Sequence, residues 1–366
     1  MTPAPLRAWL PAFLVCALAW GSSFLFISLA LRGLAPAQVG FGRVAVGAVV
    51  LWLLVAVTRQ WPRLGLRDVG AIAVVALGLS TVPFVLIPLA QQHITSILAS
   101  LLNATTPLWT AFFVALLIPH ERASRAQLGG LVLGAAGIAV LVGAWDIDGV
   151  PLAGTLLMLG ATACYGIGST MSRRLLARVD AGPAPLSAVQ ISLSVVILAP
   201  LALVAPAPAP GALELGSEAL WGLLGLGVVG TSITYVLFWR VVRVAGATTA
   251  ASVTYVVPVV ATILGVVVLR EELLWYEPVG AAIVLVGVWL AQRRPRAARA
   301  SAAAAPTATG ALAAPGALAA PDATTAPPSH ATGGAGIDAA VADGTAGGGP
   351  AATRGPAPAI QEERLD

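Results

Sequence analysis

The sequence predicts an all-α polytopic membrane protein with ten transmembrane helices, arranged as two inverted copies of one five-helix unit. Three observations predict this fold class. Hydrophobic residues make up 58% of the chain and charged residues only 10%, whereas soluble domains have about 45–50% and about 25%. Apolar runs long enough to span a bilayer follow one another along the chain. Finally, the stretch at residues 99–121 occurs again, in similar form, at residues 250–272.

The two similar stretches align on a proline that each contains. A single offset of 151 residues relates Pro107 to Pro258, Glu121 to Glu272 and Gly129 to Gly280. A proline inside a helix has no amide hydrogen and leaves one carbonyl without its partner. In lipid, such a carbonyl is tolerated only where protein or a wet cavity satisfies it. We therefore expect both prolines to interrupt their helices and to face an internal cavity.

Ten apolar segments are predicted to span the membrane. The first is longer than the apolar core of a signal peptide, about 7–15 residues, so we expect it to be retained as a helix. The predicted helices cover residues 8–31, 38–57, 69–90, 94–118, 127–144, 152–172, 186–205, 219–239, 247–269 and 277–292. The first repeat thus occupies residues 8–144 and the second residues 152–292.

The arginines concentrate in alternate loops, which predicts that both termini lie in the cytoplasm. Because each repeat has an odd number of helices, the second repeat enters the membrane upside down relative to the first. Inverted repeats are typical of transporters, whose substrate site lies near the middle of the membrane where the halves meet. Residues 300–366 are mostly Ala, Pro, Gly and Thr, which predicts a disordered cytoplasmic tail.

Several other function classes are disfavoured. The sequence pI is about 9.7, but the arginines between apolar runs are explained by membrane topology, so no nucleic-acid partner is expected. No Asp or Glu lies in the interior of a predicted helix, and no G-x-S-x-G motif occurs, so the chain is not expected to be an enzyme. No metal-ligand cluster or cofactor motif is present, and Cys16 and Cys164 both lie in apolar runs.

Residues 230–290 resemble the EamA domain of the drug/metabolite transporter superfamily. The resemblance rests on Pro258, Glu272 and Gly280 and on the residues that the offset of 151 pairs with them in the first half. It also rests on Trp-Gly-Ser-Ser at residues 20–23 and on Arg43 near the start of the second helix. Arg270 stands where the family usually has Gly. The resemblance covers residues 8–292 and implies a multi-pass transporter of the bacterial plasma membrane that exports a metabolite or drug. Helices one to four and six to nine would line its pathway.

Other transport modes stay open at this point. An exchanger or importer of the same superfamily, such as one resembling nucleotide-sugar carriers, is the main alternative, and an ion channel or intramembrane enzyme is less favoured. No carboxylate at membrane depth offers itself as a proton carrier, so facilitated export, exchange and proton antiport are all compatible with the sequence. The expected partners are a small-molecule substrate and the lipid bilayer, and the sequence allows a homodimer.

Polar and aromatic residues on helix faces are the candidates for the substrate pathway. Arg43 is the charged residue placed within an apolar run; its side chain either snorkels to the membrane surface or binds a substrate carboxylate or phosphate. Serine and threonine hydroxyls alternatively bond to their own helix. The predicted pathway residues are Trp20, Ser23, Arg43, Asn103, Thr106, Pro107, Thr110, Tyr165, Gln190, Tyr235, Trp239, Thr254, Tyr255 and Pro258, with Glu121 and Glu272 as loop or gating residues.

Overall fold

A computed structural model describes most of the two repeats. The described residues are 6–117, 124–146, 149–245, 249–250 and 252–292, and all of them belong to the compact unit formed by residues 1–324. Three of the sequence predictions lie outside this part: Glu121, the tail at residues 300–366 and the side chain of Trp239.

The described elements are all helices. The first half contains α1 (Leu6–Ala30), α2 (Pro36–Thr58), α3 (Leu66–Ala76), the π-helical η1 (Leu77–Thr81), α4 (Pro83–Gln91), α5 (Ser96–Asn103), α6 (Thr106–Leu117) and α7 (Arg125–Leu141). The second half contains α8 (Leu152–Leu175), α9 (Pro183–Leu203), α10 (Glu218–Leu224), the π-helical η3 (Gly225–Ile233), α11 (Thr234–Ala245), α13 (Val253–Leu264), the π-helical η4 (Gly265–Leu269) and α14 (Tyr276–Ala291).

Helix is present in every one of the ten predicted segments. Seven helical stretches within the described residues are long and apolar enough to cross a membrane. Three further apolar helices are shorter: Arg125–Leu141, Val253–Leu269 and Tyr276–Ala291. The fold is therefore that of an all-helical, multi-pass membrane protein.

The two repeated prolines have different effects on their helices. At Pro107 the helix breaks, because α5 ends at Asn103 and α6 begins at Thr106. The proline cannot donate to the carbonyl of Asn103, and the Thr106 hydroxyl donates to that oxygen instead, at 2.8 Å. The expected interruption at Pro258 is wrong, since α13 continues through it. Pro258 is the sixth of the twelve residues of α13, and the carbonyl that it leaves without an amide partner is that of Thr254, in the first turn.

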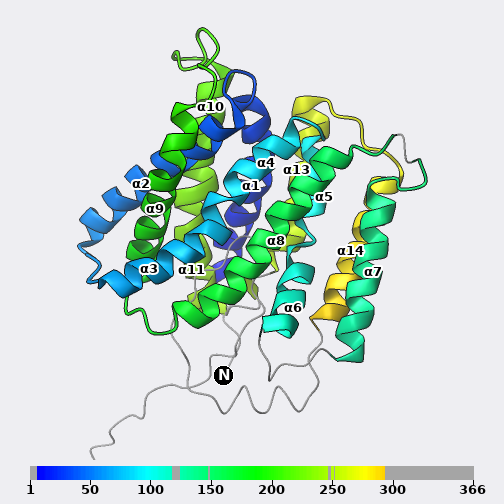
Figure 1. Cartoon of the computed structure of the whole chain (residues 1–366), viewed down its shortest axis with the longest axis horizontal. Helices are drawn as coiled ribbons and strands as arrows, with labels where there is room; N and C mark the ends of the chain where they lie inside the picture. The colour runs from blue at the N-terminus through cyan, green and yellow to red at the C-terminus, as the bar shows by residue number, and fades with distance from the viewer. Residues whose placement is uncertain (1–5, 118–123, 147–148, 246–248, 251, 293–366) are drawn as a thin grey trace, which may run out of the picture. The chain divides into compact units, whose positions relative to one another are not determined.

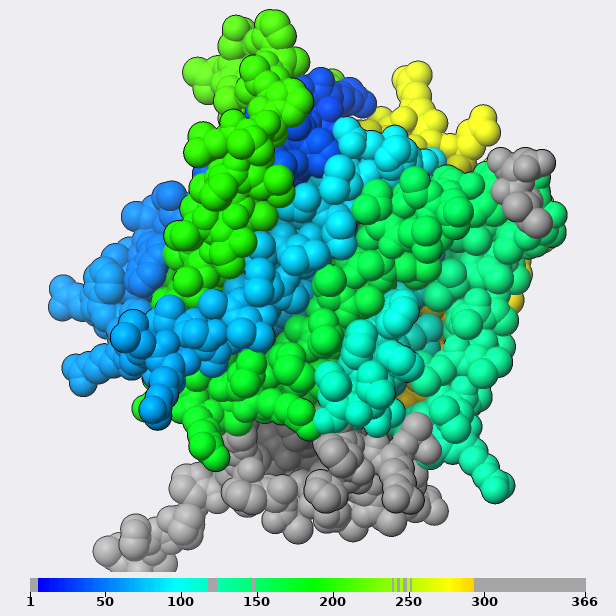
Figure 2. Space-filling view, in the orientation of Figure 1, coloured from blue at the N-terminus to red at the C-terminus, as the bar shows by residue number. Residues whose placement is uncertain are grey.

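Helices of the first half pack against helices of the second. α2 packs on α9, α1 packs on α13 and α11, and α8 lies against both α4 and α6 (Figure 1). Figure 2 shows α8 crossing one face of the molecule between α4 and α6. The buried core consequently includes side chains from both halves.

α7 and α14 form a closely packed pair of their own (Figure 1). A Cβ atom at Gly130 would lie 2.4 Å from the backbone nitrogen of Ala291, and one at Gly280 would lie 2.4 Å from that of Leu141. Small residues that let two backbones approach are typical of helix pairs in membranes. Gly129, which the sequence offset pairs with Gly280, has open space where its side chain would be. The glycine that makes the close approach is its neighbour, Gly130.

Candidate functional site

A small cavity lies where helices of the two halves meet. Its volume is about 30 Å³, which is room for roughly two water molecules at about 10–15 Å³ each. A larger molecule would require the surrounding helices to move apart. Five of the predicted pathway residues line the cavity, with apolar residues beside them: Trp20, Ser23, Arg43, Asn103 and Tyr165, together with Phe24, Ile27, Ile87 and Val257.

Arg43 turns its side chain into the protein rather than toward the membrane surface, and only 6% of its surface is exposed. Its Nε donates to the hydroxyl of Thr231 at 3.1 Å, and its Nη2 donates to the carbonyl of Gly230 at 3.3 Å. The guanidinium carbon lies 3.9 Å from the centre of the Phe84 ring, a cation–π contact. No carboxylate of the described residues lies within ion-pair distance of it. The positive charge is thus held by neutral groups and faces the cavity, and the described part of the chain supplies no counter-ion for it.

Two further polar atoms of the cavity lack partners among the described residues. The indole nitrogen of Trp20 is a donor without an acceptor, and the amide oxygen of Asn103 is an acceptor without a donor. A buried polar group that makes no hydrogen bond costs about 1–3 kcal/mol. Such groups in a native cavity call for an explanation, and water or a bound solute supplies one. The cavity therefore presents a cation, a hydrogen-bond donor and a hydrogen-bond acceptor to whatever occupies it.

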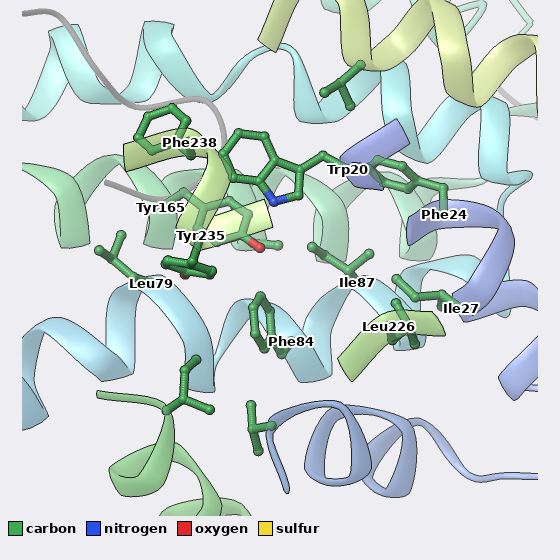
Figure 3. Packing of buried hydrophobic residues seen from close by; sticks show 14 of the residues in the cluster. Trp20, Phe24, Ile27, Leu79, Phe84, Ile87, Tyr165, Leu226, Tyr235 and Phe238 are labelled. Atoms are coloured by element: carbon green, nitrogen blue, oxygen red, sulfur yellow. The ribbon is translucent and has the colours of Figure 1, made fainter. Parts of the chain in front are cut away.

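Aromatic rings lie beside the polar atoms of the cavity. Figure 3 shows Trp20, Phe84, Tyr165, Tyr235 and Phe238 gathered around the same space, and the rings of Trp20 and Phe238 have their centres 5.3 Å apart. These rings come from both halves of the chain. Their flat apolar faces suit the carbon skeleton of an organic solute.

Three other pathway candidates from the fourth predicted helix, Thr106, Pro107 and Thr110, do not line the cavity with Asn103. Thr106 and Thr110 are buried, but their hydroxyls donate to the backbone carbonyls of Asn103 and Thr106, at 2.8 Å and 3.1 Å respectively. Pro107 is buried as well. The break between α5 and α6 separates Asn103 from the three residues that follow it.

The remaining predicted residues lie elsewhere in the described structure. The Gln190 amide nitrogen donates to Ser80 at 3.2 Å, within a buried cluster of hydroxyl groups. Thr254 and Pro258 are buried in α13 next to the cavity residue Val257. The Tyr255 hydroxyl donates to Gln292 at 2.9 Å in an exposed position. These four residues do not line the cavity around Arg43.

Tyr235 lines a second and larger cavity. Its volume is about 150 Å³, the size of an engineered apolar cavity that binds benzene. The walls come from the end of α2, the start of α9 and the residues Tyr235 and Val236 of α11.

Of the two adjacent acidic residues Glu271 and Glu272, Glu271 is the one that contacts the first half of the chain. Glu272 is exposed. The carboxylate of Glu271 accepts hydrogen bonds from the amide of Ser96 at 2.8 Å, from the hydroxyl of Ser96 at 2.8 Å and from the amide of Ile97 at 3.0 Å. This contact joins the loop after η4 to the start of α5.

Sequence reasoning missed three residues of the site: Thr231, Phe84 and Glu271. Thr231 and Gly230, the partners of Arg43, lie in the π-helical η3, where side chains do not follow the period of an α-helix. A signal was nevertheless available, because Thr231 lies 151 residues after Ser80, and both occur in π-helical segments. Phe84 carried no signal, since a phenylalanine in an apolar helix is usually ordinary core.

The groups that line the cavity can bind a solute through charge and hydrogen bonds. Among the described residues, no group of three or more potential ligands is positioned to hold a metal ion. The arginine can pair with a carboxylate or phosphate through its planar fork of donors. The Asn103 oxygen can accept a hydrogen bond from an ammonium or hydroxyl group.

Known proteins resemble this chain over most of its length. The sequence model of the EamA-like transporter family matches it twice, at residues 7–143 and 152–292. An uncharacterized transporter of Archaeoglobus fulgidus is 26% identical, over 75% of this chain and 93% of its own length. A "probable terminal-alkyne amino-acid exporter" of Streptantibioticus cattleyicolor is 28% identical, over 80% of this chain and 95% of its own.

Two more comparisons agree with these. The uncharacterized inner membrane transporter YedA of Escherichia coli is 26% identical, over 74% of this chain and 86% of its own. One crystal structure has a similar fold, with a TM-score of 0.53 at 21% sequence identity; the match covers 78% of this chain and 98% of that one.

Proposed function

The chain belongs to the EamA-like transporter family, and on this premise we propose that it exports a small organic metabolite with an acidic group across the bacterial plasma membrane by alternating access. The observation that carries the proposal is the buried Arg43, which faces a cavity between the two halves with no carboxylate of the described residues beside it. One fixed cation in such a place favours an anionic group of the solute. The position of the cavity between the two family matches fits the usual substrate site of inverted-repeat transporters.

In this proposal all ten helical segments cross the membrane, and both termini lie in the cytoplasm. The three shorter apolar helices then span with the help of flanking residues and local thinning of the bilayer. The alternation of arginine-rich loops supports the orientation, and the similar E. coli protein, an inner membrane transporter by name, supports the inner membrane. Labelling of a cysteine placed in the 60–67 loop by a membrane-impermeant thiol reagent in intact cells would contradict this orientation.

The small metabolite that fits best is an amino acid, or a similar acid that also carries a hydrogen-bond donor. Its carboxylate would pair with Arg43 and accept from the indole of Trp20, while its ammonium group would donate to Asn103. The unpartnered nitrogen of Trp20 and the unpartnered oxygen of Asn103 support this assignment. The name of the similar Streptantibioticus protein, an amino-acid exporter, points the same way.

The proposal predicts that cells overproducing the protein release more of a specific acidic metabolite into the medium than cells that lack it. The measurement is an untargeted comparison of the two media by mass spectrometry, with a strain that overproduces an unrelated ten-helix protein as control. If the enriched compounds are uncharged or cationic, the acidic-substrate assignment is wrong. If no compound differs, export itself is contradicted.

A further inference from the structure

The start of α5 is capped by a residue from the other half of the chain. The first amide groups of a helix have no partner within the helix. Here the Glu271 carboxylate accepts from the amides of Ser96 and Ile97, at 2.8 Å and 3.0 Å, and from the Ser96 hydroxyl at 2.8 Å. The Thr95 hydroxyl accepts from the next amide, that of Leu98, at 3.0 Å. The first turn of α5 thus depends on a carboxylate that lies 174 to 175 residues further along the chain.

The backbone around Glu271 is shaped to deliver this carboxylate. Arg270 has a φ of 57°, in the left-handed region that favours glycine, and the turn at Arg270 ends η4. The amide of Glu271 donates to the carbonyl of Gly265 at 3.0 Å. A Cβ atom at Gly265 would lie 2.5 Å from Ile97 Cγ1 and 2.9 Å from the carboxylate itself. The left-handed turn at Arg270 and the lack of a side chain at Gly265 together make room for the contact.

α5 connects this contact to the cavity. Every residue of α5 is buried, from Ser96 at its start to Asn103 at its end. The seven-residue separation corresponds to about 10 Å along a helix, and Asn103 lines the cavity around Arg43. If the start of α5 moves away from Glu271, the short helix can tilt and carry Asn103 with it.

We infer that Glu271 is a latch between the two halves, which keeps the outer end of the pathway closed while its carboxylate holds the N-terminus of α5. The inference rests on the proposed function, which supplies the outer side and the alternating opening. It assigns a positioning role to Glu271, since the residue does not line the cavity. Release of the three hydrogen bonds would then accompany opening toward the outside.

The test measures how fast the cavity is reached from outside. Ile27, a cavity residue near the predicted outer end of α1 and only 2% exposed, is replaced by Cys in a protein whose Cys16 and Cys164 are Ala. The labelling rate with an impermeant thiol reagent is then measured in intact cells. We expect Glu271→Gln to raise this rate about tenfold, since a loss of about 1.4 kcal/mol is a factor of ten. An unchanged rate would overturn the latch.

Glu272→Gln is the matched control, because Glu272 is the next residue, carries the same charge and is exposed. Its labelling rate should stay within about twofold of the parent. An equal acceleration by both variants would mean that surface charge, not the contact with α5, governs access, and it would refute the latch. Trp145→Cys, on the predicted outer side and 58% exposed, checks that the reagent reaches every strain equally.

Ser96→Ala keeps the test informative if Glu271→Gln accumulates poorly, and a double-mutant cycle shows whether the two side chains act together. Ser96→Ala removes only the hydroxyl donor, so we expect it alone to raise the labelling rate about threefold. When Ser96→Ala is added to Glu271→Gln, it should raise the labelling rate less than threefold, because the effects of two substitutions at one contact do not add. Independent, multiplying effects would show that the two side chains do not act together.

The latch and the proposed function fail in different ways. If the labelling difference appears but no solute is exported, the proposed function is wrong and the contact still controls access to the cavity. If export is normal in Glu271→Gln and its labelling rate is unchanged, only the latch is wrong.

Discussion

Replacing Arg43 with Gln is expected to reduce export of the acidic substrate by roughly 10- to 100-fold, because a hydrogen bond to a charged group contributes about 1.5–3 kcal/mol. The variant keeps a polar side chain of similar length but loses the charge and the fork of donors. Arg43→Lys keeps the charge without the fork, so we expect an intermediate loss. The measurement is the rate of export from preloaded cells, normalised to the amount of protein in the membrane.

Two controls separate substrate binding from a structural role of Arg43. Arg32→Gln removes an arginine from an exposed ion pair with Glu218 and should leave export unchanged. Thr231→Val removes the hydroxyl that holds Arg43 Nε but leaves the charge in the cavity, so export should largely persist. If Thr231→Val lost as much export as Arg43→Gln, the arginine would act by tying α2 to η3. If Arg43→Gln exported the substrate with unchanged affinity and rate, the anion site would be refuted.

Replacing Gly130 with Val is expected to destabilise the protein by about 1–3 kcal/mol or more, the cost of forcing extra atoms into a close-packed contact. Even one Cβ atom there would lie 2.4 Å from the nitrogen of Ala291 and 2.6 Å from the carbonyl oxygen of Gly287. Both neighbours are backbone atoms, so α7 and α14 would have to separate. The measurement is the thermal unfolding midpoint of the purified protein in detergent, together with its abundance in the membrane.

Gly129→Val is the control for this prediction, because the adjacent glycine has nothing within 4 Å of its Cβ position. The two variants add the same side chain to consecutive residues of one helix, so they have the same effect on helix propensity. We expect the unfolding midpoint of Gly129→Val to stay near that of the parent. Equal destabilisation by both would indicate a general intolerance of valine in α7 rather than a close contact between two backbones.

The sequence predicted much of the helix pattern because the hydrophobic signal of a membrane helix is strong and local. It also indicated Arg43, Trp20 and Tyr165, since polar and aromatic side chains on helix faces are candidates for a substrate pathway. That these three residues border one cavity with Asn103 required the tertiary structure. Spacing in the sequence cannot say which helices pack against each other.

The errors concern which of several neighbouring residues makes a contact. A constant offset from the first half points to Glu272, whereas the adjacent Glu271 makes the contact with α5. The offset likewise points to Gly129 where Gly130 packs against α14. In helix four, the break at residues 104–105 changes the face on which Thr106 and Thr110 lie. A local irregularity of one or two residues therefore alters which side chain reaches the site.

The most direct test of the proposed transport is a counterflow measurement with the purified protein in proteoliposomes. Vesicles are loaded with an excess of the unlabelled acidic solute identified from the medium, and uptake of the labelled solute is followed. Alternating access predicts transient accumulation of label inside, saturation with solute concentration, and exchange in both directions. The reason is that the carrier can bind a solute molecule on each side of the membrane in every transport cycle. Unitary conductance steps, or flux that rises in proportion to concentration without counterflow, would identify a channel and contradict the transporter.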